Sequence, residues 1–305
     1  MKRVMVLGVL VVVGGLSLAA TGFQAPPAGG GQGRGRGPQG PPVAQIEKVT
    51  DNLYEITGGG GNSAAFITEK GVVLVDTKLA NWGQAILDKI KTVTDKPVIE
   101  IINTHTHGDH TGSNEFFGTT VEIVAQENTR TNMEKMDAFK GDKSVFLPKK
   151  TFKDKMSLGS GKDRIDLYYF GRGHTNGDAW IVYPAIRVMQ TGDMFAWKDA
   201  PTLDRANGGS GLEYAQTVGK ALATIKDVDT LIVGHSPLRK PAELQEYQRF
   251  MTDFAAAVRA ANKAGKSVDD ATASIDLSPK YPGYKHDRYK AAIQAIYDEL
   301  KAVTN

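Results

Sequence analysis

Histidine is concentrated in one short segment of the chain. Three of the six histidines lie within six positions, in the segment THTHGDHTG at residues 104–112, and an aspartate separates the second from the third. In an extended segment alternate side chains share a face, so His105 and His107 can point at one ion. The glycine that follows permits a bend, after which Asp109 and His110 can turn toward a second ion. The spacing therefore predicts a site for two adjacent metal ions.

Two further histidines and one aspartate occur where predicted strands end. His174 lies in GRGHTNGD, His235 in VGHSP and Asp193 in QTGDMF. Loops at strand ends are where an open sheet gathers its ligands, so we expect these side chains to join the cluster. A carboxylate offers two oxygens, whereas an imidazole gives one nitrogen to one ion, which makes Asp193 the expected bridge. The sixth histidine, His286 in YKHDRYK, lacks this context and is expected on the surface.

The available ligands limit the chemistry. The chain has no cysteine, which excludes disulfides, a thiolate nucleophile and thiolate ligands. Histidine and carboxylate ligands suit zinc, and also iron or manganese. Two such ions would let a bound water ionise near pH ~7 and attack a carbonyl or phosphoryl centre, with Asp109 accepting or relaying a proton. The positive charge left over on two divalent ions favours an anionic substrate.

Other catalytic and binding classes find no support in the sequence. There is no G-x-S-x-G and no H-E-x-x-H motif, and GKS at residues 265–267 lacks the first glycine of a phosphate-binding loop because Ala260 stands there. The net charge is only +3, and the lysines and arginines are spread along the chain. We therefore expect a small-molecule substrate and no nucleic-acid partner.

Short β-rich runs must position the histidine cluster. Three runs at 53–57, 63–68 and 71–77 predict an opening antiparallel meander, and the GGGGN between the first two predicts a flexible hairpin. A buried strand at 98–104 leads directly into the cluster. Further strands are expected at 121–125, 163–170, 179–184, 186–193 and 229–235. Apolar residues at helical spacing predict helices at 79–93, 126–139, 211–225, 244–258 and 289–300. This order favours stacked layers of sheet and helix.

The N-terminal residues predict export. Residues 1–20 begin with Lys2 and Arg3, continue as an apolar run and end on small residues, which is the layout of a signal peptide. A membrane anchor is the alternative, but the apolar run is shorter than the ~20 residues of a span. Residues 21–42 are rich in glycine and proline and predict a disordered linker. We expect a periplasmic or secreted protein, with no membrane contact beyond the leader and a catalytic domain at 43–305, helical from 241.

Four segments in order, THTHGDHTG, GHTNGD, TGDMF and GHS, resemble the metallo-β-lactamase superfamily from residue 43 to about residue 239. The resemblance implies an α/β fold, a four-layer αβ/βα sandwich of two mixed β-sheets, here with a helical C-terminal extension. It implies that one metal is held by His105, His107 and His174, the other by Asp109, His110 and His235, and that Asp193 bridges them. Asp76 in LVDT matches the strand-end aspartate that supports the ligand loop in this family.

The resemblance also implies the activity. Because no cysteine is present, the chain departs from the cysteine-ligand β-lactamases, and its TGDMF segment is similar to the glyoxalase II, lactonase and phosphodiesterase branches. We expect a metal-dependent hydrolase with two Zn²⁺ ions that cleaves a small ester, lactone, thioester or β-lactam. Trp82, Trp197 and Asn207 lie on segments that could line its substrate groove.

Two other functions fit the same scaffold. One is a mononuclear non-haem iron oxygenase of the persulfide dioxygenase type, which leaves the second metal position empty. The complete second set of Asp109, His110 and His235 favours hydrolysis over this reading. The other is a binding protein that keeps its metals for structure. Metal content distinguishes the hydrolase from the iron oxygenase, and turnover distinguishes either enzyme from a binding protein. The sequence does not indicate an oligomeric state.

Overall fold

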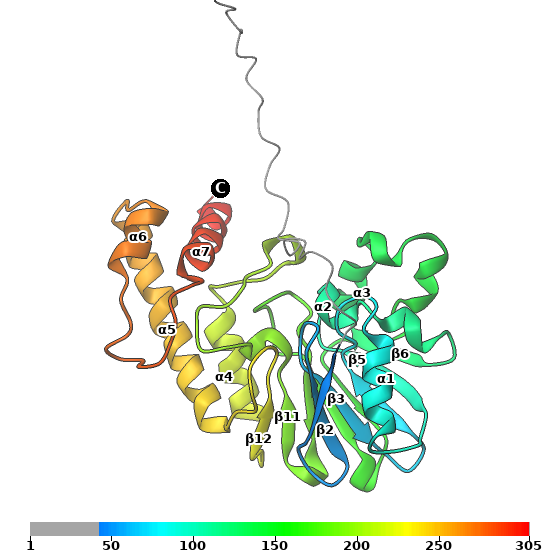
Figure 1. Ribbon diagram of the computed structural model, residues 1–305. Coiled ribbons are helices and arrows are strands. Elements are labelled where there is room, and N and C mark those ends of the chain that lie inside the picture. The colour runs from blue at the N-terminus through cyan, green and yellow to red at the C-terminus, as the bar shows by residue number, and fades with distance from the viewer. Residues whose placement is uncertain (1–42, 305) are drawn as a thin grey trace, which may run out of the picture. The chain divides into compact units, whose positions relative to one another are not determined.

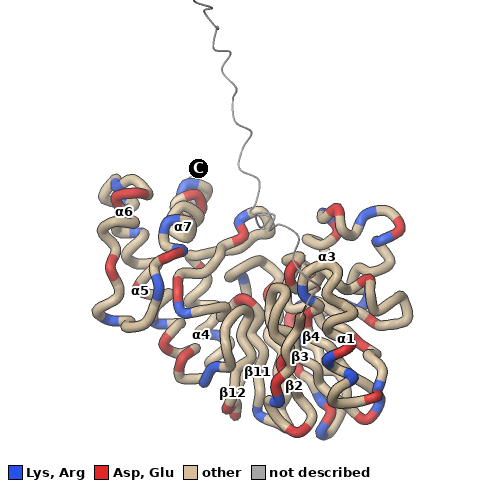
Figure 2. Tube along the Cα trace, viewed as in Figure 1, with Lys and Arg blue, Asp and Glu red and all other residues tan. Residues whose placement is uncertain are grey.

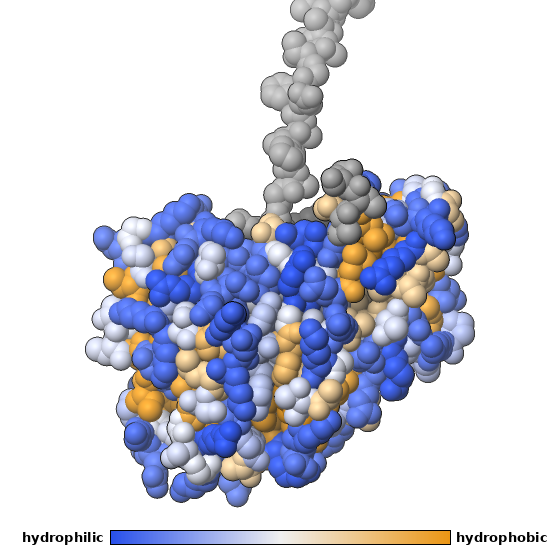
Figure 3. Space-filling model, turned by 180° about the vertical axis from the view of Figure 1, so that it is seen from behind, coloured by the Kyte–Doolittle hydropathy of each residue, from blue (hydrophilic) through white to orange (hydrophobic). Residues whose placement is uncertain are grey.

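The computed structural model describes residues 43–304 (Figure 1). The predicted signal peptide at 1–20 and linker at 21–42 lie outside the described residues. Within the described part, acidic and basic residues are interspersed along the trace (Figure 2). Seen from behind, the surface is mostly hydrophilic, with dispersed apolar residues (Figure 3). None of the described helices is long and apolar enough to cross a membrane.

The first sheet has seven strands in the order β1-β2-β3-β4-β5-β6-β7. Strands β1 to β4 pair antiparallel and β4 to β7 pair parallel, so the sheet is mixed. Parallel neighbours need a crossover, which is why helices first occur after β4. The strands are β1 Gln45–Lys48, β2 Leu53–Thr57, β3 Ser63–Ile67, β4 Val72–Val75, β5 Val98–Asn103, β6 Glu122–Gln126 and β7 Lys150–Phe152. The helices between them are α1 Gly83–Lys91, α2 Gly108–Thr111 and α3 Glu127–Met133.

The second sheet has five strands in the order β12-β11-β10-β9-β8. It is also mixed, because β8 to β11 pair antiparallel and β11 pairs with β12 in parallel. The strands are β8 Lys155–Leu158, β9 Ile165–Tyr168, β10 Trp180–Tyr183, β11 Val188–Gln190 and β12 Thr230–Ile232. Helix α4, Tyr214–Thr224, provides the parallel crossover from β11 to β12.

The two sheets pack face to face and are covered by helices on their outer sides (Figure 1). Alternate residues of each central strand enter different cores: in β4, Val73 and Val75 face the second sheet, whereas Val72 and Leu74 pack against α1. Both faces of these strands are therefore buried, which explains their nearly continuous apolar sequences. The expected four-layer αβ/βα sandwich of two mixed sheets is confirmed.

The C-terminal helices belong to the core of the second half. They are α5 Pro241–Lys263, α6 Val268–Ser274 and α7 Tyr289–Thr304. Side chains of α5 and α7 form one apolar cluster with α4 and with the outer face of β10 to β12. The buried carboxylate of Glu299 on α7 accepts hydrogen bonds from Ser210 Oγ at 2.5 Å and the Gly211 N–H at 3.0 Å. The helical C-terminus thus anchors the loop before α4.

Several element boundaries differ from the expectation. The helix expected from residue 79 begins at Gly83, because Lys78 and Asn81 have positive φ angles of 64° and 68°, which an α-helix does not allow. The helix expected to run to residue 139 ends at Met133 and is followed by short 3-10 turns. Strands β1, β7 and β8 and helix α6 were not predicted. All four are short; β1, β8 and α6 are largely exposed, and β7 is partly buried.

Candidate metal centre

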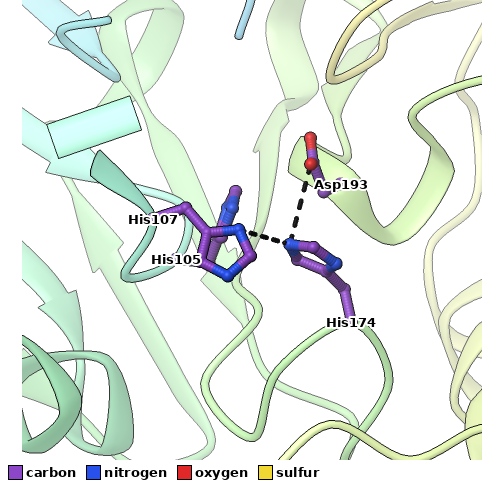
Figure 4. A group of neighbouring side chains, drawn as sticks. All are labelled: His105, His107, His174 and Asp193. Carbon is purple, nitrogen blue, oxygen red and sulfur yellow. Dashed lines mark hydrogen bonds and ion pairs between the residues drawn. The ribbon is translucent and has the colours of Figure 1, made fainter. Parts of the chain in front are cut away.

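Seven histidine and aspartate side chains converge at one edge of the two sheets. They form two sets whose ligand atoms lie within 4.8 Å of one another. The first ligand group is His105, His107, His174 and Asp193, and the second ligand group is Asp109, His110 and His235. Figure 4 shows the imidazoles of the first group and Asp193 pointing toward one another. The structure thus brings together every side chain for which metal ligation was predicted.

The first sheet delivers four of the seven through a single turn. Strand β5 ends at Asn103, and His105 and His107 follow in an extended segment. The N–H groups of His110 and Thr111 then bond to the His107 carbonyl, both at 3.0 Å, and begin helix α2. This change from extended to helical backbone turns Asp109 and His110 away from the direction of the first two histidines.

The second sheet supplies the other three side chains from separate loops. His174 follows β9, Asp193 lies in a 3-10 turn after β11, and His235 comes shortly after β12. The residue before His235 must be glycine, because a Cβ at Gly234 would lie 1.9 Å from Asp193 Oδ1. The glycine in GHS therefore makes room for the aspartate.

The ring nitrogens on the inner side of the cluster face one another at hydrogen-bond distance. His107 Nδ1 lies 3.0 Å from His174 Nε2, and His110 Nε2 lies 3.3 Å from His235 Nε2. His105 Nε2 is buried and has no hydrogen-bond partner. Buried nitrogens with converging lone pairs are unfavourable unless a cation binds between them. The donor set, nitrogen and carboxylate oxygen without sulfur, fits zinc, iron or manganese.

Asp193 lies between the two groups. One oxygen is 3.3 Å from His110 Nε2, and the other is 3.3 Å from His235 Nε2 and 3.6 Å from His174 Nε2. Its side chain therefore contacts histidines of both groups. A carboxylate in this position has one oxygen available for each of two ions.

The outer nitrogens of the histidines are held by hydrogen bonds. His174 Nδ1 donates to the Thr202 carbonyl, and His107 Nε2 donates to Asp204, both at 2.7 Å. His110 Nδ1 donates to Asp76 at 2.7 Å. Since carbonyls and carboxylates only accept, each of these contacts places a proton on the outer nitrogen, and the inner nitrogen faces the other ligands. Such partners orient metal-binding histidines.

Asp76, for which the resemblance implies support of the ligand loop, contacts one histidine directly and a second through a threonine. It is fully buried after β4, and its carboxylate accepts hydrogen bonds from the Thr104 N–H, the Thr104 hydroxyl and His110 Nδ1. Because the Thr104 hydroxyl donates to Asp76, it accepts from His105 Nδ1, 3.0 Å away. The carboxylate thus orients His110 directly and His105 through Thr104.

Sequence reasoning missed Asp204, the partner of His107. Its carboxylate also accepts from the Asn207 side chain at 2.7 Å and the Asn207 N–H at 3.1 Å. Burial acts to raise the pKa of Asp204, but the hydrogen bonds from His107 and Asn207 hold this pKa well below its usual range. In the sequence, an aspartate three residues before an asparagine indicates only a local turn.

Burial and neighbouring charges compete at the buried histidines. Burial lowers the pKa of His105 well below its ordinary value, and His110 adds to the lowering. Burial has the same effect on His110, but the carboxylates of Asp76 and Asp193 outweigh it and raise its pKa well above the ordinary value. For Asp193, burial acts to raise the pKa, yet His235 and His110 hold it well below its usual range. Asp193 is therefore an anion.

The three residues expected to contact substrate have different surroundings. The Trp197 ring lies against His235, with centroids 5.4 Å apart, and the Arg288 guanidinium sits 3.6 Å from the centroid of the same ring. Trp82 packs against the GGGGN loop, where a Cβ at Gly59 would meet its ring at 2.0 Å. Asn207 supports Asp204, as described above. His286 is exposed and stacks on Tyr289, as expected of a surface residue.

Comparisons with known proteins show which family the sequence matches. The sequence model of the metallo-β-lactamase superfamily matches residues 56–235. A relative from Elizabethkingia meningoseptica, "Metallo-beta-lactamase type 2", is 26% identical over 236 residues, covering 72% of this chain and 90% of the relative.

Two solved structures show the same fold. A metallo-beta-lactamase from Pontibacter korlensis superposes with a TM-score of 0.60 at 19% identity, covering 68% of this chain and 99% of that one. The sec-alkylsulfatase Pisa1 from Pseudomonas sp. superposes with a TM-score of 0.69 at 16% identity, covering 84% of this chain and 50% of that one. The similarity to Pisa1 thus covers a larger share of this chain than the similarity to the β-lactamase.

Proposed function

The chain belongs to the metallo-β-lactamase superfamily and is a metal-dependent hydrolase, and from this we propose an exported enzyme that uses two zinc ions to cleave a small ester, lactone, thioester or β-lactam. The observation that carries the two-ion proposal is the position of Asp193, which contacts His174 of one ligand group and His110 and His235 of the other. A mononuclear site would not need the second group. Export is inferred from the leader-like residues 1–20.

Each ligand group would hold one ion, with Asp193 shared between them. When bound, the ions would polarise the substrate carbonyl and lower the pKa of a bound water toward ~7. The chain's own contribution to proton transfer is Asp109. Its side chain is 30% exposed, and its Oδ2 lies 3.4 Å from His235 Nε2, so it is both part of the second group and accessible. Asp109 can accept the proton of the attacking water and pass it to the leaving group.

The rim of the site supports an anionic substrate. Arg288, from the segment before α7, places its guanidinium on the Trp197 ring, and that ring lies against His235. An exposed cation beside a centre that holds divalent ions attracts negative charge. β-Lactam antibiotics commonly carry a carboxylate, and the relatives named as metallo-β-lactamases add weight to this substrate class.

Metal content coupled to turnover tests the proposal. Zinc-supplemented protein should carry two zinc ions per chain by mass spectrometry and should hydrolyse nitrocefin, a lactone, an ester or a thioester in initial-rate assays. One iron per chain with oxygen consumption would instead support the mononuclear oxygenase. Two bound ions without turnover on the whole panel would support a binding protein.

A variant tests the shared carboxylate. Asp193→Ala should lose the ion of the second group preferentially and lose activity, because its charge lies between the two groups. Asp229→Asn serves as the control, since Asp229 is exposed and pairs with Arg187 just before β12, at the opposite end of that strand from His235. Equal activity of Asp193→Ala and the parent would remove Asp193 from the mechanism.

A further inference from the structure

The GGGGN loop, Gly58–Asn62, is the loop of the β2–β3 hairpin, as expected, and it contacts the second ligand group of the metal centre. It joins β2 to β3 and bonds to the backbone on both sides of the second ligand group. The Gly61 N–H donates to the Asp109 carbonyl at 3.1 Å, and the Asn62 N–H donates to the Gly234 carbonyl at 2.7 Å. The Asn62 side-chain amide also donates to the carbonyls of Val233 and Ser236, both at 2.9 Å. The loop therefore ties the segment of Asp109 to the segment of His235.

The loop approaches the ligands too closely to carry side chains. A Cβ at Gly61 would lie 2.1 Å from His110 Cε1, and a Cβ at Gly60 would lie 2.6 Å from the Asp109 carbonyl oxygen. Both separations are far shorter than a van der Waals contact. The backbone of the loop, without side chains, thus packs directly against the second ligand group. Gly60, with a φ of 108°, also has a conformation that favours glycine.

A buried lysine forms hydrogen bonds to the backbone of this loop. Lys78 is fully buried, and its ammonium donates to the carbonyls of Ile56 and Gly61, both at 2.8 Å. These carbonyls lie just before and inside the loop. Burying an ammonium is unfavourable unless it makes hydrogen bonds. The two bonds to the loop therefore account for a lysine at this buried position. An apolar side chain would fill the same volume without holding the loop.

The backbone around Lys78 connects the loop to the helix that bears His110. The Leu79 N–H donates to the Gly59 carbonyl at 2.9 Å, and the Thr77 N–H donates to the His110 carbonyl at 2.7 Å. Asp76 and Lys78 both have positive φ angles, 60° and 64°, a conformation that costs non-glycine residues about 1–2 kcal/mol each. This strained segment sends Asp76 to His110 and Lys78 to the loop.

We propose that Lys78 and the glycine loop position the second ligand group, so that the affinity of its ion depends on two elements that do not touch that ion. The inference rests on the proposed two-ion function. Lys78 is a positioning residue, since its contacts with the ligands run through the loop. Disturbing either element should weaken the ion held by Asp109, His110 and His235 about tenfold or more, the range found when supports of ligands are removed, and leave the first group nearly unchanged.

Two variants with matched controls test the inference. Gly61→Ala places a methyl group against His110, and Lys78→Met removes the ammonium but keeps a long side chain. Gly219→Ala is the control for the methyl group, because its Cβ would have only one neighbour, at 3.7 Å. Lys96→Met is the control for the ammonium, since Lys96 likewise donates to two loop carbonyls, those of Thr68 and Glu69, at the far turn between β3 and β4.

The readout is stepwise metal affinity, from zinc competition with a chelator and from cobalt(II) absorption titrations. Both variants should bind the first ion like the parent and the second about tenfold or more weakly, and both controls should match the parent. Second-ion affinity equal to that of the parent in Gly61→Ala would overturn the inference, and this variant decides if Lys78→Met fails to fold.

Histidine NMR of the metal-free protein separates this inference from the proposed function. Gly61→Ala should shift the ring ¹⁵N signals of His110 and His235 and leave those of His107 and His174 in place. If the parent bound one ion only, the two-ion proposal would fail, while shifted His110 and His235 signals would still support positioning by the loop. Unchanged signals of His110 and His235 would refute it whatever the metal content.

Discussion

Replacement of Asp204 by asparagine should weaken metal binding by the first ligand group. Asp204 accepts hydrogen bonds from His107 Nε2 and from both the side chain and the backbone N–H of Asn207. An asparagine can keep its carbonyl oxygen toward His107, but its NH₂ group then faces the Asn207 N–H, and that hydrogen bond is lost. The bond that remains to His107 also loses the negative charge of its acceptor.

The expected size of the effect follows from these contacts. A hydrogen bond to a charged group contributes about 1.5–3 kcal/mol, and one between neutral groups about 0.5–1.5 kcal/mol. The difference, about 1.4 kcal/mol, corresponds to about a tenfold change in an equilibrium constant. Asp204→Ala removes the acceptor altogether and frees the His107 ring to rotate, so its effect should approach about 100-fold.

Competition between the protein and a chromophoric chelator for zinc measures this affinity. Asp229→Asn is the control, because Asp229 also accepts two hydrogen bonds, from Arg187 at 2.6 and 2.9 Å, but does so before β12, at the opposite end of that strand from His235. The order of affinities should be parent and control, then Asp204→Asn, then Asp204→Ala. If both Asp204 variants held the first ion as tightly as the parent, the hydrogen bond to His107 would have no part in ligand orientation.

Three further variants probe other parts of the molecule. Glu55 is 2% exposed, one of its oxygens lacks a hydrogen-bond partner, and burial raises its pKa from 4.5 to about 7. The folded state therefore loses stability as the pH rises from about 4.5 to 7. In urea unfolding, the free energy of unfolding of Glu55→Gln relative to the parent should be about 3 kcal/mol higher at pH 8 than at pH 4.5. A difference from the parent that does not depend on pH would contradict this. Trp197→Ala removes the ring under Arg288 and should raise KM for an anionic substrate about two- to fivefold with little change in metal content, whereas an unchanged KM would place the ring outside the substrate site. His286→Ala should change neither metal content nor rates, because the ring is exposed and stacks only on Tyr289 among the described aromatic residues; loss of an ion would show that its surface assignment is wrong.

The predicted ligands could be found from sequence because their signal is local. Each lies in or beside a strand-end loop rich in glycine, and three of the histidines lie within one short segment. Asp204 could not be found in this way, since its partner His107 lies 97 positions earlier and only folding brings the two together. The role of Asn207 was missed for the same reason, because it depends on Asp204.

The layered architecture was also predictable, whereas the local boundaries were not. Strands such as β4 have both faces buried and therefore appear as continuous apolar runs. The start of α1 was misplaced because Leu79 keeps the helical spacing, yet it is 46% exposed and directly follows Lys78, which has a positive φ. For the GGGGN loop, composition predicted a hairpin, which the structure confirms, but it did not reveal that the absence of side chains permits contact with His110 and Asp109.

The segment after β5 and helix α2 bring their ligands from one sheet, and the loops after β9, β11 and β12 bring theirs from the other. Each ion would therefore cross-link the two halves of the sandwich. A ligand that binds only the folded chain stabilises it by about 2.7 kcal/mol at 100 times its dissociation constant. In zinc-poor surroundings the enzyme would therefore lose resistance to proteases together with its activity. Chelation should open the seam between the sheets first, and the lifetime of the folded protein would follow the supply of metal.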